Sequence, residues 1–509
     1  MSVKGFKSHP YIPNSVPEVE QEMLRAIGLQ SIEELHEEVP QEIVLKENMN
    51  IPEAFGSEYE LRRHVEGLLK KNKSCADALN FLGAGCYQHY VPALCDEIAS
   101  KGEFLTAYGG ESYNDFGRFQ ALFEFESLVA EMVDMEVVNV PTMDYAQAAS
   151  TAIRMACRVA DKRVALLPES MDPEKQAIIR NYCEPDLDFV IVKADPATGR
   201  MDLADLKAKL NAETGAVYFE NPMYLGMFEV NAREIADMAH AAGAQVVVGC
   251  DPISLGVVAS PRSFGADIIC GDVQSLGIHM NFGGGQSGFM ATMDDPKYVL
   301  EFPSRLFGIC QTSKEGEYAF ADVAYDRTSF GHLRDQAKEY VGTQTALWGI
   351  TAGVYLSTMG PKGMQEVGET IMRNAQYAAK KLAQIPGVSL RFADPFFEEF
   401  VLDFSKSGKT VAEINKALLA KNIFGGKDLS KEFDWIGECA MYCVTEIHMK
   451  EDIDRLAAEL AAILDEAKRN EKDRQKQSRT HRIPPGKVGR ACYFRTVPEG
   501  RTRRAGEQG

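Results

Sequence analysis

The sequence has little basic charge for its length and no long uninterrupted apolar segment. Its 509 residues carry a formal net charge of −19 at pH 7, which argues against general affinity for nucleic acid. No apolar run is long enough to span a membrane, and the start of the sequence lacks the apolar core of a signal peptide. We therefore expect a cytoplasmic protein that binds neither membranes nor nucleic acid.

Spacings typical of metal sites are also missing. The eleven cysteines are an odd number, scattered without pairs at metal-ligand spacing, as expected for reduced thiols in the cytoplasm. Cys439 and Cys443 stand four apart, but the alternating residues between them favour a strand in which both thiols are buried. His279 and His332 have no ligands at suitable spacing, so we predict no bound metal.

Composition and pattern divide the chain into four parts. Residues 1–60 form a polar, Pro-rich N-terminal arm, 61–344 a large α/β domain, 345–467 a small α+β domain, and 468–509 a basic tail. The tail has many Lys and Arg and few aliphatic residues. A solvated extension explains this composition better than docking onto an anionic partner.

Strand and helix patterns alternate through the large domain, which is typical of a doubly wound, mostly parallel sheet. Expected strands are 164–167, 189–192, 216–219, 246–248, 268–270 and 288–291, with helices at 146–159, 173–182, 203–210 and 232–241. We expect an irregular arm over residues 293–342. In the small domain we expect strands at 388–392, 400–404 and 441–444, and helices at 343–359, 363–384, 411–421 and 450–467.

The stretch from Gln245 to Thr292 organises this pattern. It contains three short apolar runs of the kind found in parallel strands covered on both faces. Asp251, Asp272 and Gly283–Gly285 follow strands, and ligands in such sheets lie beyond the carboxyl ends of the strands. The Gly run lies between a loop and a strand, so it is not a dinucleotide-binding fingerprint. We predict a ligand cleft at this edge.

Other loops contribute candidates to the same cleft. The segments 81–93 and 103–117 each combine glycines with polar rings, although the rings of the first also suit local packing alone. A predicted strand ends at Glu220-Asn-Pro-Met-Tyr, which directs further polar residues to the cleft. The candidate cleft-lining residues are His89, Thr106, Tyr108, Asn221, Tyr224, Gly283, Gly284 and His332.

This arrangement resembles the core of the fold-type-I enzymes that use pyridoxal phosphate. In that class, an Asp after one strand pairs with the pyridine nitrogen, and a Lys one strand later forms the Schiff base. Asp251 matches the Asp, whereas no Lys occurs between Asp251 and Lys297. Gln274 and Ser275 fall where the Lys would be, and neither side chain can form an imine. Asp251, Gln274 and Ser275 are therefore vestigial positions, and we assign no catalytic or cofactor-binding residue in this chain.

A narrower resemblance runs from about residue 10 to 465. The motifs are Tyr11-Ile-Pro-Asn, Phe81-Leu-Gly-Ala-Gly, His89-Tyr-Val-Pro-Ala, Asp251-Pro-Ile-Ser-Leu-Gly, Gly271-Asp-Val-Gln-Ser-Leu-Gly and Val444-Thr-Glu. They resemble the first subunit of glycine dehydrogenase (decarboxylating), the P-protein of the glycine cleavage system. In the two-subunit form of that family, the second subunit carries the Schiff-base Lys.

The resemblance implies a fold-type-I α/β chain without covalently bound cofactor, inactive when isolated. A homologous second subunit would hold pyridoxal phosphate in a heterotetramer, decarboxylate a small amino acid, and pass the aminomethyl group to a lipoylated carrier, the H-protein.

Three segments depart from the family pattern: 109–117, 144–150 and 334–343. Two alternatives therefore stay open, namely the same assembly acting on a different amino acid or acceptor, and a non-catalytic scaffold subunit. In cofactor-binding relatives, the helix that starts near residue 145 receives the phosphate. Asp144 at that helix start is better suited to N-capping than to binding phosphate.

Overall fold

The computed structural model describes residues 11–44, 47, 50–104, 116–323, 327 and 345–480. Contacts between residues divide the chain into two compact units, residues 1–73 and 74–509. Thr106, Tyr108 and His332 lie outside the described residues, as do segment 334–343, nearly all of 109–117, and the tail beyond Thr480.

The first unit contains α1 (Pro17–Ala26), the 3-10 turn η1 (Glu33–His36) and α2 (Glu58–Leu69). Ser57 caps α2 by accepting a hydrogen bond from the Glu60 backbone N–H at 3.1 Å. Together these three elements bury one side chain, Leu24. Such a unit has almost no core of its own.

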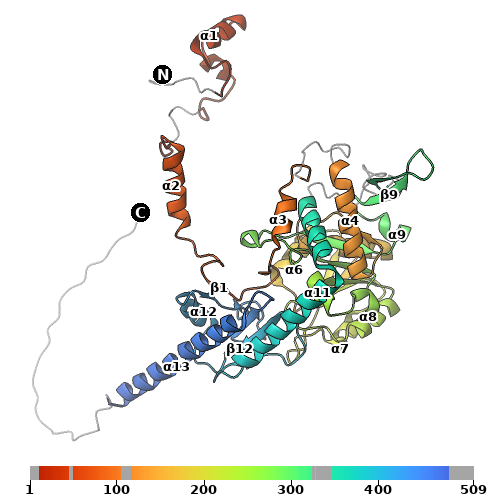
Figure 1. Cartoon of the computed structure of the whole chain (residues 1–509), viewed down its shortest axis with the longest axis vertical. Coiled ribbons are helices and arrows are strands. Elements are labelled where there is room, and N and C mark those ends of the chain that lie inside the picture. The colour runs from red at the N-terminus through yellow and green to blue at the C-terminus, as the bar shows by residue number, and fades with distance from the viewer. Residues whose placement is uncertain are drawn as a thin grey trace, which may run out of the picture. The chain divides into compact units, whose positions relative to one another are not determined.

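The second unit is built on a seven-stranded sheet with the order β2-β8-β7-β6-β5-β3-β4 (Figure 1). Its strands are β2 (Val137–Val138), β3 (Val164–Pro168), β4 (Asp188–Val192), β5 (Thr214–Glu220), β6 (Gln245–Cys250), β7 (Ile268–Asp272) and β8 (Gly288–Thr292). All six strands predicted for this domain are therefore confirmed. The five from β3 to β7 run parallel.

Strand β8 corrects one expectation, because it pairs antiparallel with β7, and β2 pairs antiparallel with β8. The connection from β7 to β8 holds only the 3-10 turn η5 (Asn281–Gly283) among its helical elements. A parallel return needs a crossover, usually through an α-helix. The chain therefore comes back in the opposite direction.

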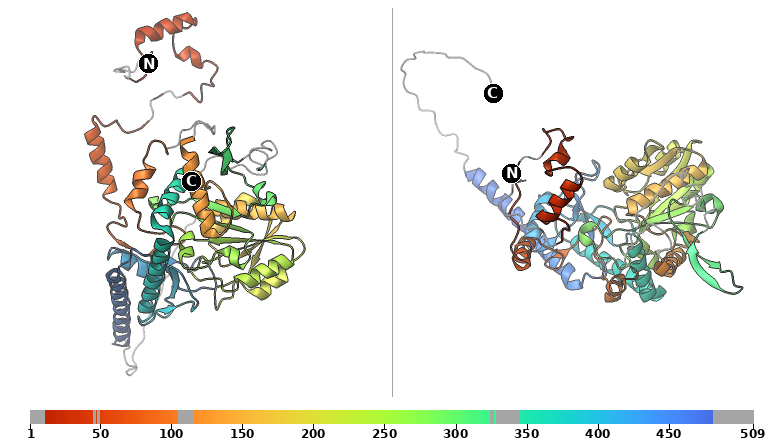
Figure 2. Two further views of the ribbon diagram at one scale, coloured as in Figure 1. Left: turned by 45° about the vertical axis from the view of Figure 1, so that its right-hand side comes forward. Right: turned by 90° about the horizontal axis from the view of Figure 1, so that it is seen from above.

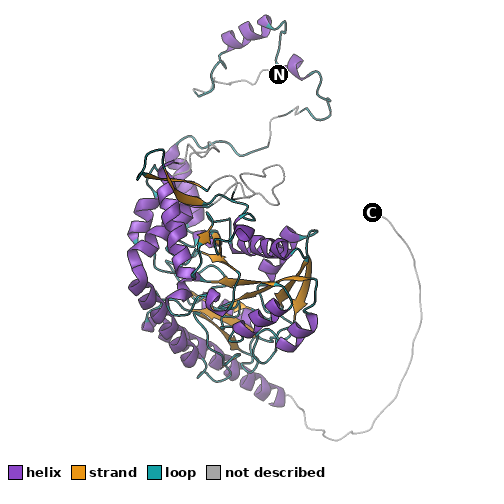
Figure 3. Ribbon diagram, turned by 90° about the vertical axis from the view of Figure 1, so that its right-hand side faces the viewer, coloured by secondary structure: helices purple, strands orange, loops and turns teal. Residues whose placement is uncertain are grey.

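Alternate residues of each central strand supply two different cores. Val246 and Val248 of β6 join one core, and Val247 joins the other. Helices α4 (Phe116–Val133), α7 (Leu203–Lys209), α8 (Ala232–Ala241) and α11 (Ala346–Leu382) supply the first core, together with α3 (Ala93–Ala99) and the turns η3 (Pro252–Gly256) and η4 (Pro261–Phe264). Helices α5 (Tyr145–Ala160), α6 (Pro173–Cys183) and α9 (Pro296–Val299) cover the other face. Figure 3 shows the strands enclosed by these helices.

The region expected to be an irregular arm contains regular structure. Strands β9 (Phe307–Gln311) and β10 (Tyr318–Asp322) form a separate antiparallel hairpin that contacts α4 and projects outward (Figure 2). Its turn includes Gly316 at φ +82°, a backbone conformation that glycine adopts without strain. The expectation of no regular structure in this part of the arm was wrong.

Helix α11 connects the large and small parts of the second unit. It changes direction at Gly360, before Pro361, so the two helices predicted here lie end to end. Its first half packs into the core of the large sheet and its last turns pack into the core of the small sheet. Figure 1 shows it beside α4 and α13 (Lys450–Thr480), with which it makes contact.

The small sheet has the order β11-β12-β15-β14 and is antiparallel. Its strands are β11 (Ser389–Leu390), β12 (Glu399–Asp403), β14 (Lys427–Asp428) and β15 (Cys439–Cys443). Helices α12 (Val411–Leu419) and α13 cover one face, and a separate parallel pair joins β1 (Leu79–Asn80) to β13 (Ile423–Phe424). Cys439 and Cys443 are both buried in β15, as expected. Within the described ranges, no helix is long and apolar enough to cross a membrane.

The two sheets meet at Gly226, in the loop after β5. Gly226 has φ +90°, and a Cβ there would lie 2.0 Å from the Glu399 backbone oxygen of β12. We expect Gly226→Ala to lower the free energy of unfolding by about 4 kcal/mol or more, because strain and backbone overlap add. Gly408→Ala is the matched control, since Gly408 has φ +82° but open space around it.

Gly408→Ala should lower the free energy of unfolding only by the backbone strain, about 1–2 kcal/mol. Urea unfolding followed by circular dichroism measures both variants. Equal losses in the two would contradict the close approach of the two sheets at this loop.

Candidate functional site

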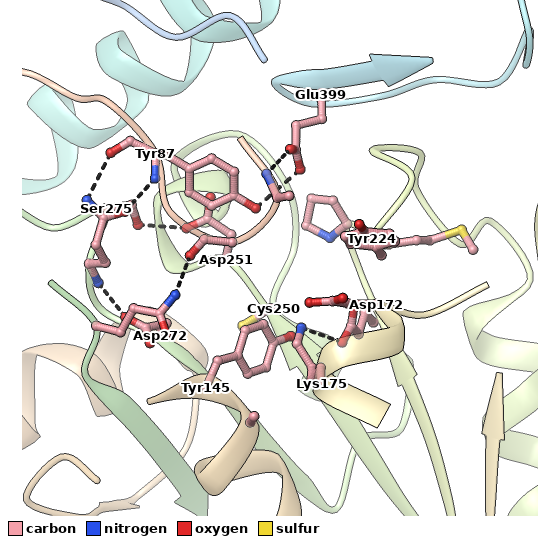
Figure 4. Close-up of a pocket in the computed structure, with 18 of the residues that line it drawn as sticks. Tyr87, Tyr145, Asp172, Lys175, Tyr224, Cys250, Asp251, Asp272, Ser275 and Glu399 are labelled. Atoms are coloured by element: carbon pink, nitrogen blue, oxygen red, sulfur yellow. Dashed lines mark hydrogen bonds and ion pairs between the residues drawn. The ribbon is translucent and has the colours of Figure 1, made fainter. Parts of the chain in front are cut away.

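A cavity of about 180 Å³ lies at the carboxyl ends of the central parallel strands. Its walls come from the residues that follow β5, β6 and β7, the first turns of α5 and α6, the loop before α3, and β12 of the small sheet. Figure 4 shows Tyr87, Asp251, Ser275 and Asp272 toward one side and Lys175, Asp172 and Tyr224 toward the other. The predicted location of the cleft is therefore where a cavity is found.

Asp251 follows β6 and is anchored through one oxygen. Its Oδ1 accepts hydrogen bonds from the Ile253 backbone N–H at 3.2 Å and from Ser275 Oγ at 2.7 Å. Burial raises the pKa of Asp251, although the hydrogen bond from Ser275 opposes the rise. Ser275, at the position where a Schiff-base Lys would be expected, is thus bound to the carboxylate.

Gln274 fastens the loop before α3 to the end of β7. Its Oε1 accepts from the Tyr87 N–H at 2.9 Å, and its Nε2 donates to the Tyr87 carbonyl at 2.9 Å and to that of Ile278 at 3.0 Å. All three bonds are to backbone groups. The Gln274 side chain therefore uses its hydrogen bonds to fix this loop to the end of β7.

Asp272 ends β7 and is 8% exposed. Its Oδ1 accepts hydrogen bonds from the backbone N–H groups of Gln274 and Ser287, both at 2.9 Å. Burial raises the pKa of Asp272 to about 7, and these hydrogen bonds limit the rise. The carboxyl is therefore close to half-protonated at neutral pH.

Two glutamates of the small domain close the cavity. Glu399 accepts from the Ala84 N–H at 2.6 Å and from the Tyr87 hydroxyl at 3.2 Å, and burial raises its pKa to about 7. Glu398 is 4% exposed. Burial, and after it the neighbouring Asp251 carboxylate, raises the pKa of Glu398 well above its usual range.

His89 lies behind this wall. Its Nδ1 is 2.8 Å from Glu446 Oε2, and its Nε2 is 3.7 Å from Glu398 Oε2. Burial lowers the pKa of His89, but the Glu446 carboxylate outweighs burial and the net shift is upward. The ring is therefore held by a buried contact with Glu446.

Lys175, in the first turn of α6, is the one lysine among the described lining residues. Its Nζ lies 2.7 Å from Glu220 Oε1 and 3.5 Å from the centroid of the Tyr145 ring. The same Glu220 oxygen accepts a hydrogen bond from the Tyr218 hydroxyl at 2.6 Å. The ammonium group is therefore already paired.

Asp144 caps α5 at the edge of the cavity. Its Oδ1 accepts a hydrogen bond from the Gln147 backbone N–H at 2.7 Å, which confirms the capping interpretation. The carboxylate occupies the mouth of a helix N-terminus, where an anionic ligand would otherwise bind.

The candidate residues divide into three groups. Tyr224, Asp251, Gln274 and Ser275 line the cavity. His89, Asn221, Gly283 and Gly284 are described but are not among its lining residues. The Asn221 Oδ1 accepts from the Glu229 N–H at 3.2 Å, and Gly283 and Gly284 form the turn at η5. Thr106, Tyr108 and His332 are outside the described residues.

Sequence reasoning missed six charged residues of the lining: Asp172, Glu174, Lys175, Glu220, Glu398 and Glu399. Glu220 ends a predicted strand, and that position alone could have identified it. In the part of the chain that the structure describes, no group of three or more His, Cys, Asp or Glu side chains could hold a metal ion.

The raised carboxyl pKa values predict that the fold loses stability as pH rises. A carboxyl whose pKa is raised on folding stabilises the fold fully below its unfolded value and loses that effect as pH rises through its folded value. Asp272 and Glu399 both have folded pKa values of about 7. Between pH 6 and pH 8 we therefore expect the free energy of unfolding to fall by about 1–3 kcal/mol.

Urea unfolding at several pH values measures this slope. Asp272→Asn should make the slope shallower, since one of the groups with a raised pKa is removed. Glu213→Gln is the control and should leave it unchanged, because Glu213 is exposed and lies just before β5, at the opposite end of that strand from the cavity-lining Glu220. A wild-type slope of zero, or one of opposite sign, would contradict the burial of these carboxyls.

The fold and the position of the cavity define the structural class of this protein. The second unit has the architecture of the fold-type-I pyridoxal phosphate enzymes. A solved structure of Burkholderia pseudomallei sphingosine-1-phosphate lyase shares that fold, with a TM-score of 0.60, 13% identity, and 85% of this chain and 96% of that chain covered. A crystal structure of glycine decarboxylase (P-protein) of the glycine cleavage system, in inhibitor-bound form, is more similar, with a TM-score of 0.77, 31% identity, and 90% and 100% covered.

Sequence comparison then gives the family. The family model for the glycine cleavage system P-protein matches residues 9–460. A probable glycine dehydrogenase (decarboxylating) subunit 1 of Staphylothermus marinus is 38% identical over 91% of this chain and 100% of that relative. One of Pyrococcus furiosus is 39% identical over 89% and 99%. The chain belongs to the glycine cleavage system P-protein family and matches the curated subunit 1 relatives over nearly their whole length.

Proposed function

We propose that this chain is the cofactor-free subunit of a two-subunit glycine dehydrogenase (decarboxylating). Its partners are a homologous second subunit that binds pyridoxal phosphate and a lipoylated carrier, the H-protein. The proposal rests above all on Ser275, which stands where a Schiff-base Lys is expected and is bound to Asp251 at 2.7 Å. No Lys occurs between Asp251 and Lys297.

The cavity does not suit pyridoxal phosphate in two further respects. The phosphate of that cofactor is an anion, and the N-terminus of α5 is already capped by Asp144 with Asp272 nearby. Lys175 could supply an amine, but its Nζ is held by Glu220 and by the Tyr145 ring. We therefore assign no step of the reaction to a cofactor in this chain.

The role that remains for this chain is structural and positional. Pyridoxal phosphate on the second subunit would supply the electron sink for decarboxylation. This chain would complete a heterotetramer around it, and assemblies of this kind commonly bury more than about 2,000 Å² per interface. The small amino-acid substrate, glycine, would bind at the second subunit's site.

The purified full chain should form no aldimine with pyridoxal phosphate. After incubation with the cofactor, we expect no absorbance band near the visible edge and no pyridoxyl group on Lys175 after borohydride reduction, because Lys175 is paired with Glu220. The lysine-bearing second subunit, treated in the same way, is the positive control. Lys175→Arg separates labelling inside the cavity from labelling of surface lysines. A reducible band that disappears in Lys175→Arg would contradict the proposal.

A further inference from the structure

Loop 84–90 lies between the large sheet and the small sheet and forms part of the cavity wall. Its lining residues are Ala84, Gly85 and Tyr87. On the side of the large sheet, the Tyr87 backbone exchanges two hydrogen bonds with the Gln274 side chain, both at 2.9 Å. The loop is therefore fixed to the end of β7 through a side chain rather than through strand pairing.

Carboxyl groups of the small domain hold the same loop from the other side. The Ala84 N–H donates to Glu399 at 2.6 Å. The Tyr87 hydroxyl donates to the same side chain at 3.2 Å (Figure 4). The Tyr90 N–H donates to Glu446 at 2.7 Å. Closure of the loop therefore depends on where these two acidic side chains are placed.

A buried chain of side chains crosses the same boundary. The His89 ring of the loop has its Nδ1 2.8 Å from Glu446 Oε2 and its Nε2 3.7 Å from Glu398 Oε2. Glu398 is hydrogen-bonded to Asp251, whose Oδ1 accepts from Ser275 Oγ at 2.7 Å. These contacts connect the small sheet and the loop to the ends of β6 and β7.

The hydrogen bond between Asp251 and Glu398 needs a proton. An ionised carboxylate only accepts hydrogen bonds, so one of the two groups must be protonated in order to donate. Asp251 Oδ2 and Glu398 Oε2 are buried, and no other described group donates a hydrogen bond to either oxygen. Loss of the proton would leave two buried carboxylates side by side, which is costly because like charges repel and neither is solvated.

We propose that the Asp251–Glu398 hydrogen bond is a proton-dependent latch that keeps loop 84–90 closed over the cavity. When the proton leaves, the two carboxylates repel, Glu398 moves away from Asp251, and the loop opens. This device goes beyond the proposed function, because it concerns the opening of the cavity in this chain and needs no cofactor.

The neighbours of Glu398 transmit its movement to the loop. The preceding residue stays attached to the large part of the unit, because the Phe397 N–H donates to the Gly226 carbonyl at 3.2 Å. The following residue is Glu399, which holds Ala84. Displacement of Glu398 is therefore taken up on the side of the loop rather than at the junction of the two sheets.

The surroundings of the pair decide the direction of the pH effect. The titratable groups that face it, from loop 84–90, β6, α11, β12, β15 and the segment after β15, are Tyr87, His89, Cys250, Tyr355, Glu399, Cys443 and Glu446. Of these seven groups only His89 can be a cation, and it is already in contact with Glu446. The surroundings therefore do not compensate a second negative charge on the pair.

The latch is expected to hold at low pH and to fail as pH rises. Burial raises the pKa of Asp251, and burial followed by the Asp251 carboxylate raises the pKa of Glu398. A carboxyl with a raised pKa contributes its stabilisation at low pH and loses it as pH rises through the folded value, which here lies above the usual value of about 4.

Amide hydrogen exchange of the purified full chain without cofactor tests the latch. Exchange of the Ala84, Tyr87 and Tyr90 amides is measured by mass spectrometry of overlapping peptides, relative to an unstructured peptide at the same pH. From about pH 5 to about pH 9, we expect their protection to fall at least tenfold. Titration of Glu399 alone would act in the opposite sense, because a carboxylate is a stronger acceptor than a neutral carboxyl.

Two variants separate the latch from general pH effects. Glu398→Gln keeps an N–H donor toward Asp251 at every pH, so protection of the loop should stay nearly constant. Asp272→Asn removes a different buried carboxyl, and the tenfold loss should remain. Constant or rising protection in the wild-type chain would overturn the proposal, and this comparison needs no variant. An equal loss in a folded Glu398→Gln protein would also overturn it.

Discussion

The isolated chain should catalyse no exchange of labelled bicarbonate into the carboxyl group of glycine. The chain together with the second subunit, pyridoxal phosphate and a lipoylated carrier should catalyse it readily. Ser275 cannot form the imine through which the cofactor acts, and enzymes of this kind accelerate their reactions by about 10⁶-fold or more. Omitting the second subunit should therefore lower the rate by a factor of that order.

Exchange by the isolated chain with the cofactor alone would contradict this expectation. No exchange by the complete assembly with glycine would favour one of the two alternatives left open by the sequence, a different amino acid or acceptor, or a scaffold role. Of the three divergent segments, only 144–150 lies wholly within the described residues, and there Asp144 serves as a helix cap.

Deletion of residues 1–55 should abolish co-purification with the second subunit. The described part of residues 1–55 buries only Leu24 and leaves apolar side chains such as Met23, Ile27 and Ile43 exposed. A segment with so little core is unstable alone and is expected to gain its stability by packing in the assembly. Size-exclusion chromatography of the co-expressed subunits measures the loss.

Helix α2, which the deletion leaves in place, exposes four apolar residues at helical spacing, Leu61, Val65, Leu68 and Leu69, so point substitutions test this helix separately. Leu61→Asp combined with Leu68→Asp places charge on the apolar face and should weaken association at least tenfold. Arg63→Asp, on the opposite side of the same helix at 100° per residue, is the matched control. Unchanged assembly after the deletion would count decisively against a role for this segment in binding the partner.

Much of the fold follows from local pattern. The continuous apolar run Val246–Val248 indicates burial on both faces, and the structure divides these residues between two cores. The direction of a strand does not follow from this pattern. A fully buried strand such as Gly288–Thr292 has the same apolar pattern whether it runs parallel or antiparallel to its neighbour. The hairpin at 307–322 was missed because its two short strands lie in a polar, Gly-containing stretch.

The site was predictable only where its residues follow strands. Asp251, Gln274 and Ser275 come directly after β6 and β7, so their place at the cavity follows from the topology. Glu398 and Glu399 reach the same cavity from the small domain, more than a hundred residues later in the chain. Only tertiary packing brings them to Asp251, and no local pattern encodes it.

The most direct test of the cofactor-free assignment is to locate the cofactor in the assembled enzyme. The co-purified subunits, loaded with pyridoxal phosphate, are reduced with borohydride, and the peptides of both chains are analysed by mass spectrometry. We predict a pyridoxyl-lysine in the second subunit and none in this chain, Lys175 included, because that ammonium group is bound to Glu220. A stoichiometric pyridoxyl group on a lysine of this chain would contradict the assignment.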